Sequence, residues 1–430
     1  MNTNSTYTIF WFRRDLRLND NHGLYEALLN NTNVIPIFIF DPNILDHFDI
    51  KTDRRIDYIV QKIKQLKSSI NLQVFHDTPE NVFKYLIKNY SINAVYTNTD
   101  YEPQAINRDK HIHSIVQLQN ITFKSFKDQV IFHENDILKN DGKPYTVYTP
   151  YSKKWKELFK NKKVENYPSE NYLHNICKET ISNLDINKLD FYSNNISIPE
   201  NIPENIINTY DKTRDFPYLK GTTELATALR FGTISIRQCV EIAYKLNETW
   251  LNELIWREFF MQILYHFPQV TTQCFKPKYE NIVWRNNEEE FKLWCEGKTG
   301  YAIVDAGMRE LNQTGKMHNR VRMIVASFLC KHLLIDWRWG ETYFAQKLLD
   351  YDLSANNGNW QWAAGCGCDA APYFRVFNPY EQTKKFDPNF IYIKKWIPEY
   401  DEFYESTPIV EHKFARERAL ATYKVGLERS

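Results

Sequence analysis

The densest group of chemically useful side chains lies near the carboxyl-terminal end, where two acids, two asparagines and two tryptophans fall within thirteen residues. They read Asp350-x-Asp352-x-x-x-Asn356-Asn357-Gly358-x-Trp360-Gln361-Trp362. Carboxylates accept hydrogen bonds from hydroxyls or ring N–H groups, and an amide suits a ring atom whose protonation changes. Asp-x-Asp also suits a hard cation, but the glycine and the distal glutamate of an EF-hand loop are missing at the required offsets. A purely structural role is the alternative.

Two further groups lie on predicted helices. Glu253 stands three residues from both Trp250 and Trp256, with Arg257 beside them. Residues three apart share a helical face, and an apolar setting raises a carboxyl pKa or makes the group seek a donor. A Glu–Arg surface pair is the alternative. His318-Asn319-Arg320-x-Arg322-Met323 opens a second helix, whose N-terminus suits an anion; a capped helix with solvated arginines is the alternative there.

A loop with a glycine and two hydroxyls is a candidate phosphate site. It reads Gly221-Thr222-Thr223-x-Leu225, and Phe231-Gly232-Thr233-Ile234-Ser235 follows. Hydroxyls near a glycine at a helix start can bind phosphate together with backbone N–H groups. An ordinary helix cap explains the same residues.

Two other patterns fail as motifs. Gly297-Lys298-Thr299 ends like a P-loop, but that motif needs a glycine where Lys292 stands. Cys366 and Cys368 lack the second pair of ligands that a zinc site needs, so we expect no metal.

Short apolar runs alternate with helical patterns over residues 1–132. The runs predict strands at Tyr7–Phe12, Val34–Phe40, Leu72–Phe75, Ala94–Thr97 and Ile121–Phe126. Helical patterns lie near Gly23–Leu29, Arg55–Leu66, Glu80–Asn89 and Gln104–Leu118. This alternation predicts a Rossmann-like α/β domain with a parallel five-stranded sheet, which binds ligands at the carboxyl ends of its strands. Phe12-Arg13-Arg14-Asp15-Leu16-Arg17 replaces a G-x-G-x-x-G motif after the first strand, which argues against an ordinary dinucleotide site.

The rest of the chain divides into a connector and a helical region. Residues 133–205 are rich in Asn, Lys, Tyr and Pro and predict a long interdomain connector with some helix around Tyr151–Phe159. Residues 206–430 predict an all-helical domain, in which Leu251–Leu264 and Val321–Leu334 carry apolar residues at helical spacing.

Composition excludes several classes of protein. The 430 residues are 43% hydrophobic and 25% charged, which excludes wholesale disorder. The apolar runs are too short to span a bilayer, and no secretory signal opens the chain. The net charge is +1, so a polyanionic partner requires a local basic patch. Seven scattered cysteines fit reduced thiols in a cytoplasm. Nine of the eleven tryptophans lie at or beyond Trp250 and suit either a large core or stacking surfaces for flat ligands.

Taken together and in order, these residues resemble the photolyase/cryptochrome family, most of all its class I members that act on cyclobutane pyrimidine dimers (deoxyribodipyrimidine photolyases). The resemblance spans nearly the whole chain, through Phe10–Arg17, Tyr148-Thr149-Pro150, Glu253–Phe259, Asp350–Trp362 and Pro372–Pro379. It implies an α/β antenna-chromophore domain over 1–132, a connector over 133–205 and a helical FAD-binding catalytic domain over 206–430. It also implies a light-driven lyase in which reduced FAD lends an electron to a flipped-out dimer; flipping is a general property of photolyases.

The resemblance assigns roles to matching positions. Asn356 faces flavin N5, and Arg322 pairs with Asp350 beside the flavin ring. The other FAD contacts are Tyr210, Thr222, Thr223, Leu225, Ala226, Trp250 and Asp352, although Glu224 and Ala226 depart from the family's usual phosphate loop. Trp284, Trp337 and Trp360 match an electron-transfer chain. The dimer contacts are Glu253, Asn319, Met323, Trp256 and Trp362, and the DNA contacts are Arg214, Arg257, Arg320, Arg375 and Gln382.

Four residues separate the branches of the family, and one of them, Glu253, is often missing in plant cryptochromes. Enzymes for the (6-4) photoproduct carry histidines where Asn319 and Met323 stand, and plant cryptochromes carry Asp where Asn356 stands. A cryptochrome-like blue-light photoreceptor without repair activity is the alternative. The resemblance also implies a second antenna chromophore, a folate or a deazaflavin of open identity, and a cytoplasmic monomer whose partner is UV-damaged DNA, with no membrane.

Overall fold

The structure, a computed structural model, describes residues 6–45, 53–162, 164–182, 184–186, 196–400 and 407–429. The chain forms two compact units, each assembled from separate stretches. The first comprises residues 1–136, 158–202 and 224–242, and the second 137–157, 203–223 and 243–430. The functional boundaries that the sequence suggests, after residues 132 and 205, stay a prediction.

The first unit is built on a parallel five-stranded sheet, and the predicted fold class is confirmed. The strands are β1 (Thr6–Phe12), β2 (Val34–Phe40), β3 (Gln73–His76), β4 (Ser91–Asn98) and β5 (Thr122–Phe126). Their order is β3-β2-β1-β4-β5, and Thr8 of β1 pairs with Val34 on one side and Ala94 on the other. The strand order therefore reverses between β1 and β4, the kind of switch point at which open parallel sheets bind ligands.

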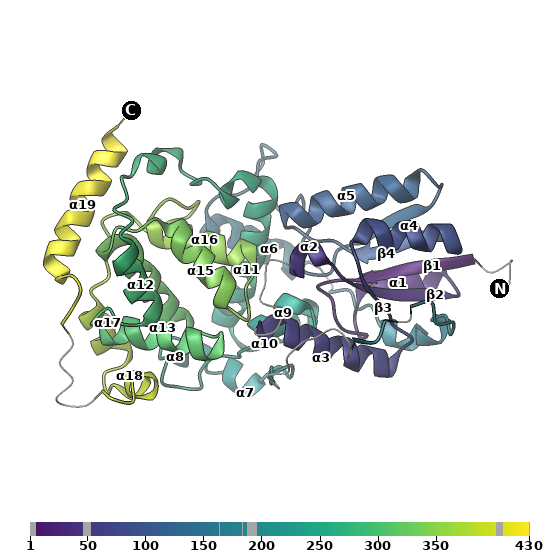
Figure 1. Cartoon of the computed structure of the whole chain (residues 1–430), viewed down its shortest axis with the longest axis horizontal. Coiled ribbons are helices and arrows are strands. Elements are labelled where there is room, and N and C mark those ends of the chain that lie inside the picture. Colours follow the sequence, from purple (N-terminus) through teal and green to yellow (C-terminus); the bar gives the residue numbers. More distant parts are fainter. Residues whose placement is uncertain are drawn as a thin grey trace. The chain divides into compact units, whose positions relative to one another are not determined.

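Helices cover both faces of this sheet, as the alternating pattern predicts. The helices are α1 (His22–Asn30), α3 (Arg54–Ser69), α4 (Pro79–Asn89) and α5 (Pro103–Gln117). Phe10 and Phe12 of β1 pack with residues of α1 and α3, whereas Ile9 and Trp11 pack with residues of α4 and α5. Figure 1 shows α4 and α5 on the side of the sheet opposite α3. Because successive side chains point to opposite faces, one apolar strand supplies both cores.

The shorter elements of this unit are α2 (Pro42–Leu45), η1 (Ser169–Asn175) and α9 (Ala226–Phe231), together with most of α10 (Ile236–Leu246). The connector helix α6 (Tyr148–Lys160) belongs to the second unit as far as Glu157.

The second unit is helical. Its elements include α7 (Glu204–Ile207), α8 (Tyr210–Thr213), α11 (Glu248–His266), η3 (Pro268–Thr271), η4 (Pro277–Asn281), α12 (Glu288–Glu296), α13 (Ala302–Thr314), α14 (Asn319–Ser327), η5 (Phe328–His332), α15 (Trp337–Lys347), α16 (Leu353–Ala364), α17 (Pro379–Phe386), α18 (Ile391–Trp396) and α19 (His412–Glu428). No helix among the described residues combines the length and the apolar character needed to cross a bilayer.

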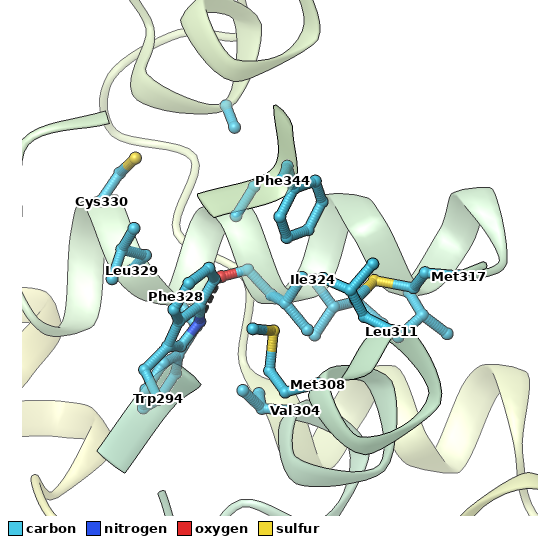
Figure 2. Packing of buried hydrophobic residues seen from close by; sticks show 14 of the residues in the cluster. Trp294, Val304, Met308, Leu311, Met317, Ile324, Phe328, Leu329, Cys330 and Phe344 are labelled. Carbon is cyan, nitrogen blue, oxygen red and sulfur yellow. Dashed lines mark hydrogen bonds between the residues drawn. The ribbon is translucent and has the colours of Figure 1, made fainter. Parts of the chain in front are cut away.

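The core of this unit lies among α12, α13, α14 and α15. Figure 2 shows Trp294 beside Phe328, with Met308 and Leu311 near Ile324. Trp294 is fully buried, and its indole N–H donates to the Val325 carbonyl at 3.2 Å. Because its N–H is hydrogen-bonded to α14, this core tryptophan helps to hold that helix in position. The other end of α14 carries predicted site residues.

The helix predicted over Val321–Leu334 is interrupted. α14 ends at Ser327, and a π-helical turn, η5, follows it. Lys331 and His332, the last two residues of this turn, are buried at 1% and 0% exposure. The apolar pattern alone cannot signal this change of pitch.

Candidate active site

Three helices of the second unit present the predicted site residues, and polar caps start each of them. The Asn247 side chain accepts from the backbone N–H groups of Thr249 and Trp250 and begins α11. Asp352 does the same for α16, accepting from Ser354 at 3.1 Å and Ala355 at 3.2 Å. Side-chain caps of this kind satisfy N–H groups that have no partner within the helix.

His318 caps the third helix, α14, through its Nδ1 atom, which accepts from the backbone N–H of Arg320 at 3.1 Å. Burial and the neighbouring Arg322 charge lower the His318 pKa to about 4. The ring is therefore neutral near pH 7, which leaves Nδ1 able to accept. This cap places Asn319, Arg322 and Met323 on the first turns of α14.

A cavity of about 600 Å³, part of it open to solvent, lies between α14 and α16. It is lined by eight of the predicted site residues, namely Asn319, Arg322, Met323, Asp350, Asp352, Asn356, Trp360 and Trp362. The structure thus brings together residues that sequence reasoning assigned to both a cofactor and a substrate.

An ion pair and an amide give this cavity its polar character. Arg322 donates from Nη2 to both oxygens of Asp350, at 2.9 and 3.1 Å, and from Nε to the Met317 carbonyl at 2.8 Å. Asn356 donates from Nδ2 to the Glu341 carboxylate at 2.9 Å and to the Glu341 carbonyl at 3.1 Å. The amide oxygen of Asn356 is thus directed away from Glu341 and can accept from a ligand N–H.

Glu253 and Trp256 lie on α11 and do not line this cavity. Arg214 donates to the Glu253 carboxylate, and Arg214 also lies 5.6 Å from the centre of the Tyr210 ring. Burial raises the pKa of Glu253, although the Arg214 charge opposes the shift. Phe260 connects α11 to α16: it lies 5.3 Å from Trp256, and a Cβ on Gly358 of α16 would stand 2.2 Å from its ring. That glycine lets the two helices approach closely.

The predicted phosphate loop crosses the boundary between the two units. Gly221 lies against Thr213, where a Cβ would stand 2.6 Å from the threonine Cβ, so the close approach requires glycine. Thr222 and Thr223 are half-buried and belong to the second unit. Leu225 is buried and Ala226 is exposed, and both belong to the first unit.

The predicted DNA contacts differ in their surroundings. Arg320 donates to Asp215 at 2.7 Å and lies 4.3 Å from the Phe386 ring centre. Arg375 is exposed, with its guanidinium 5.9 Å from the Trp362 ring centre. Arg257 and Gln382 are half-buried. Arg375 is thus the member of this set that is most accessible to a phosphate.

The three tryptophans predicted to form a relay differ in exposure. Trp360 lines the cavity, Trp337 is buried, and Trp284 is half-buried. A Cβ on Gly340 would stand 2.1 Å from the Trp360 ring, so α15 approaches this ring closely one turn after Trp337. In the described part of the chain the Trp337 indole N–H has no hydrogen-bond partner. Among the described residues, no group of three His, Cys, Asp or Glu side chains is arranged to hold a metal ion.

Comparison with known proteins identifies the family of this chain. Residues 250–418 match the model for the FAD binding domain of DNA photolyase, and residues 8–169 match the DNA photolyase model. The deoxyribodipyrimidine photo-lyase of Vibrio cholerae is 36% identical over 97% of this chain and 99% of its own length. That of Escherichia coli is 33% identical over 97% of this chain and 98% of its own length.

This chain belongs to the DNA photolyase family. A class III photolyase of Agrobacterium tumefaciens has a similar structure, with a TM-score of 0.86, 30% identity and coverage of 99% of this chain and 98% of its own. An archaeal photolyase of Sulfolobus tokodaii has a TM-score of 0.83 and 33% identity, with 97% and 100% covered. A Synechocystis cryptochrome, at 24% identity and a TM-score of 0.82, shares the fold. The resemblance inferred from the sequence is confirmed.

Sequence reasoning missed Glu341 and gave Tyr148 no role at the site. Glu341 follows Trp337 by four residues and so lies on the same side of α15, but nothing in the sequence links it to Asn356. Tyr148 opens the Tyr-Thr-Pro sequence that carries part of the photolyase resemblance, and in the structure it contacts Trp256 directly.

Proposed function

We propose that this chain is a light-dependent lyase that splits cyclobutane pyrimidine dimers in UV-damaged DNA, with FAD held by the cavity between α14 and α16. The observation that carries the proposal is the composition of that cavity. Asn319, Met323 and Trp362, assigned to the dimer, line it together with the Arg322–Asp350 pair and Asn356, assigned to the flavin. Relatives over nearly the full length are named deoxyribodipyrimidine photo-lyases.

The cavity residues suit FAD chemically. The Asn356 oxygen can accept from a ring N–H, and the Arg322–Asp350 pair offers a donor and an acceptor to the polar edge of a flat ring. Apolar and aromatic neighbours, among them Phe344 and Trp360, complete the lining. A mostly apolar cavity with a few placed polar groups is the usual form of a cofactor site.

FAD, when bound and reduced, supplies a light-excited electron to the dimer and takes it back once the cyclobutane ring has opened. The chain's own residues then have three tasks. Trp256 and Trp362 provide flat apolar surfaces for a dimer that has left the base stack. Glu253 and Asn319 hydrogen-bond the pyrimidine edge. Trp360, Trp337 and Trp284 form a path for an electron between the cavity and the surface.

A repair assay tests this function. Purified protein, reduced anaerobically, is mixed with oligothymidylate that contains dimers and is illuminated with blue light. Repair restores thymine absorbance at 260 nm only in the light. Protein that carries flavin and responds to light but leaves dimers intact would instead be a photoreceptor, and the proposal would fail.

We further propose that exposed arginines bind the phosphates beside the lesion. Arg375 is exposed next to Trp362 and makes no ion pair with the residues that the structure describes, so its guanidinium can reach a DNA backbone. Affinity for DNA should fall as salt rises, and Arg375→Ala should reduce the slope of log K against log salt by about 1. An unchanged slope would remove Arg375 from the interface.

The remaining assignments are proposals with simple tests. The Sulfolobus photolyase is described with two FAD molecules and a light-harvesting role is implied for one; we propose a second chromophore here too, a folate or a deazaflavin, which chromatography of the released pigments would identify. All seven cysteines are free, which supports a reducing cytoplasm, and cell fractionation tests this. Light scattering of the purified protein tests the proposed monomer.

A further inference from the structure

Tyr148, at the first residue of α6, lies flat against Trp256. The ring centroids are 3.7 Å apart and the planes differ by 5°. Phe259 meets both rings edge-on, 5.9 Å from Tyr148 and 5.6 Å from Trp256. Stacked and edge-on contacts are both favourable for aromatic rings, and together they restrict Trp256 from two directions.

Hydrogen bonds to Asn252 and Asp369 hold Tyr148 itself in place. Its phenol donates to the carbonyl of Asn252 at 2.9 Å, one turn before Trp256 on α11. Its backbone N–H donates to the Asp369 carboxylate at 3.1 Å. Tyr148 therefore contacts both the ring of Trp256 and the backbone of the helix that carries it.

The rest of α6 strengthens this attachment. Trp155 donates from Nε1 to the buried Glu258 carboxylate at 2.8 Å, and the Tyr151 phenol lies 3.4 Å from the same oxygen. Glu258 lies two residues after Trp256 on α11. The Tyr148–Trp256 stack is thus the first of several contacts between α6 and α11, and it is not an isolated contact at the surface.

The electrostatic surroundings connect Tyr148 to Glu253. Burial raises the Tyr148 pKa far above its ordinary value, and the nearby Glu253 charge adds to the shift. The phenol therefore keeps its proton near pH 7 and can donate to Asn252. Tyr148 supports the same short stretch of α11 that presents Glu253 and Trp256.

We propose that Tyr148 is a positioning residue for the lesion site, which holds the Trp256 indole in its binding orientation before a dimer arrives. The inference rests on the proposed function, in which Trp256 is a wall of the dimer pocket. A tryptophan held in place has little rotamer freedom to lose on binding, so the advantage applies to a flipped dimer and not to undamaged DNA.

Affinity measurements on four proteins test the proposal. Tyr148→Leu removes the stacked ring, whereas Tyr148→Phe keeps the ring and removes only the hydroxyl. Tyr145→Leu is the matched control, because Tyr145 lies near the same helix and contacts Tyr151 edge-on at 6.3 Å. Each is compared with the unaltered protein in its FAD-loaded form. Dissociation constants are measured in the dark for one oligonucleotide with and without a single dimer, and repair per absorbed photon is measured at saturating DNA.

Tyr148→Leu should weaken binding of dimer-containing DNA about threefold to tenfold, the cost of ordering one large side chain. Binding of undamaged DNA and repair at saturation should not change. Tyr148→Phe should restore most of the affinity, and Tyr145→Leu should resemble the unaltered protein. Flavin content and melting temperature show whether each variant is folded. If Tyr148→Leu cannot be purified in folded form, Tyr148→Met replaces it, because methionine fills similar space without a flat ring.

Three outcomes would overturn the inference: an unchanged dimer affinity in Tyr148→Leu, an equal loss for damaged and undamaged DNA, or the same loss in Tyr145→Leu. Each of these would leave the proposed function intact as long as the unaltered protein prefers and repairs dimers. If the unaltered protein shows no preference and no repair, the proposed function itself fails.

Discussion

Asn356 is held by Glu341 through two hydrogen bonds from one amide nitrogen, at 2.9 Å to the carboxylate and 3.1 Å to the carbonyl. Asn356 lines the cavity, and the backbone carbonyl can only accept. The pair therefore determines which end of the amide a ligand meets. Burial raises the pKa of Glu341, and the Asn356 hydrogen bond opposes the shift.

We expect Glu341→Leu to make the FAD reduction potential more negative. Without the carboxylate, the Asn356 amide nitrogen can donate only to the Glu341 backbone carbonyl. The amide is then held less rigidly, so its oxygen forms a weaker hydrogen bond with the flavin N–H that reduction creates. Glu341→Gln, whose amide oxygen can still accept from Asn356, should keep a potential near that of the unaltered protein. Spectroelectrochemical titration of the FAD-loaded proteins measures both, and equal potentials in all three would show that Glu341 does not orient Asn356.

The sequence predicts the sheet well and the site in part, for physical reasons. Strands such as Val34–Phe40 are apolar throughout because helices cover both faces, and this makes them easy to recognise. Asp350 to Trp362 could be recognised as part of a site because one short segment carries several of the polar groups that line the cavity. The Glu341–Asn356 contact could not be recognised, because it joins two helices. A single polar contact between helices leaves no periodic pattern in the sequence of either helix.

Some differences arise from local geometry. The continuous helix expected over Val321–Leu334 becomes α14 followed by the turn Phe328–His332, because an apolar stripe reports burial and not the number of residues per turn. The pairing of Arg214 with Glu253, and of Arg320 with Asp215, was also not foreseen. The sequence shows these charges without showing which of them are already paired.

We expect Glu253→Gln to reduce repair per absorbed photon by about tenfold, because a hydrogen bond to a charged group contributes roughly 1.5–3 kcal/mol. The substitution keeps the shape of the side chain but removes the charge that pairs with Arg214. Flash-induced repair of dimer-containing oligothymidylate, at saturating DNA, measures the effect. Glu248→Gln at the exposed start of α11 is the control, and unchanged repair in Glu253→Gln would exclude a direct role at the dimer.

Trp337→Phe should stop light from reducing oxidised FAD while leaving repair by chemically reduced protein unchanged. Phenylalanine is harder to oxidise than tryptophan, and Trp337, which is buried, is the middle member of the predicted path from Trp360 to Trp284. Loss of flavin absorbance under blue light with an external reductant measures the first quantity, and the repair assay measures the second. Trp339→Phe, on the same helix, is the control. Photoreduction that survives in Trp337→Phe would show that electrons reach the flavin by another route.

We expect His332 to make the second unit less stable in acid. The ring is fully buried, stacks on Phe328 at 4.7 Å and meets His412 at 2.9 Å. Burial, together with the charges of His412 and Arg418, lowers its pKa to about 3. An unfolded histidine titrates near 6.5. Between these two values the unfolded chain holds a proton that the folded chain lacks, so stability falls as the pH falls through this window.

His332 should therefore contribute a loss of about 1.4 kcal/mol in unfolding free energy for each pH unit below 6.5. His332→Phe removes the titrating group, so its unfolding free energy should fall less steeply over this range, with His318 still contributing down to about pH 4. Urea unfolding followed by tryptophan fluorescence suits the measurement, because every tryptophan except Trp11 lies in the second unit. His113→Gln, at an exposed site, should keep the original slope, and equal slopes in all three proteins would contradict a neutral buried His332.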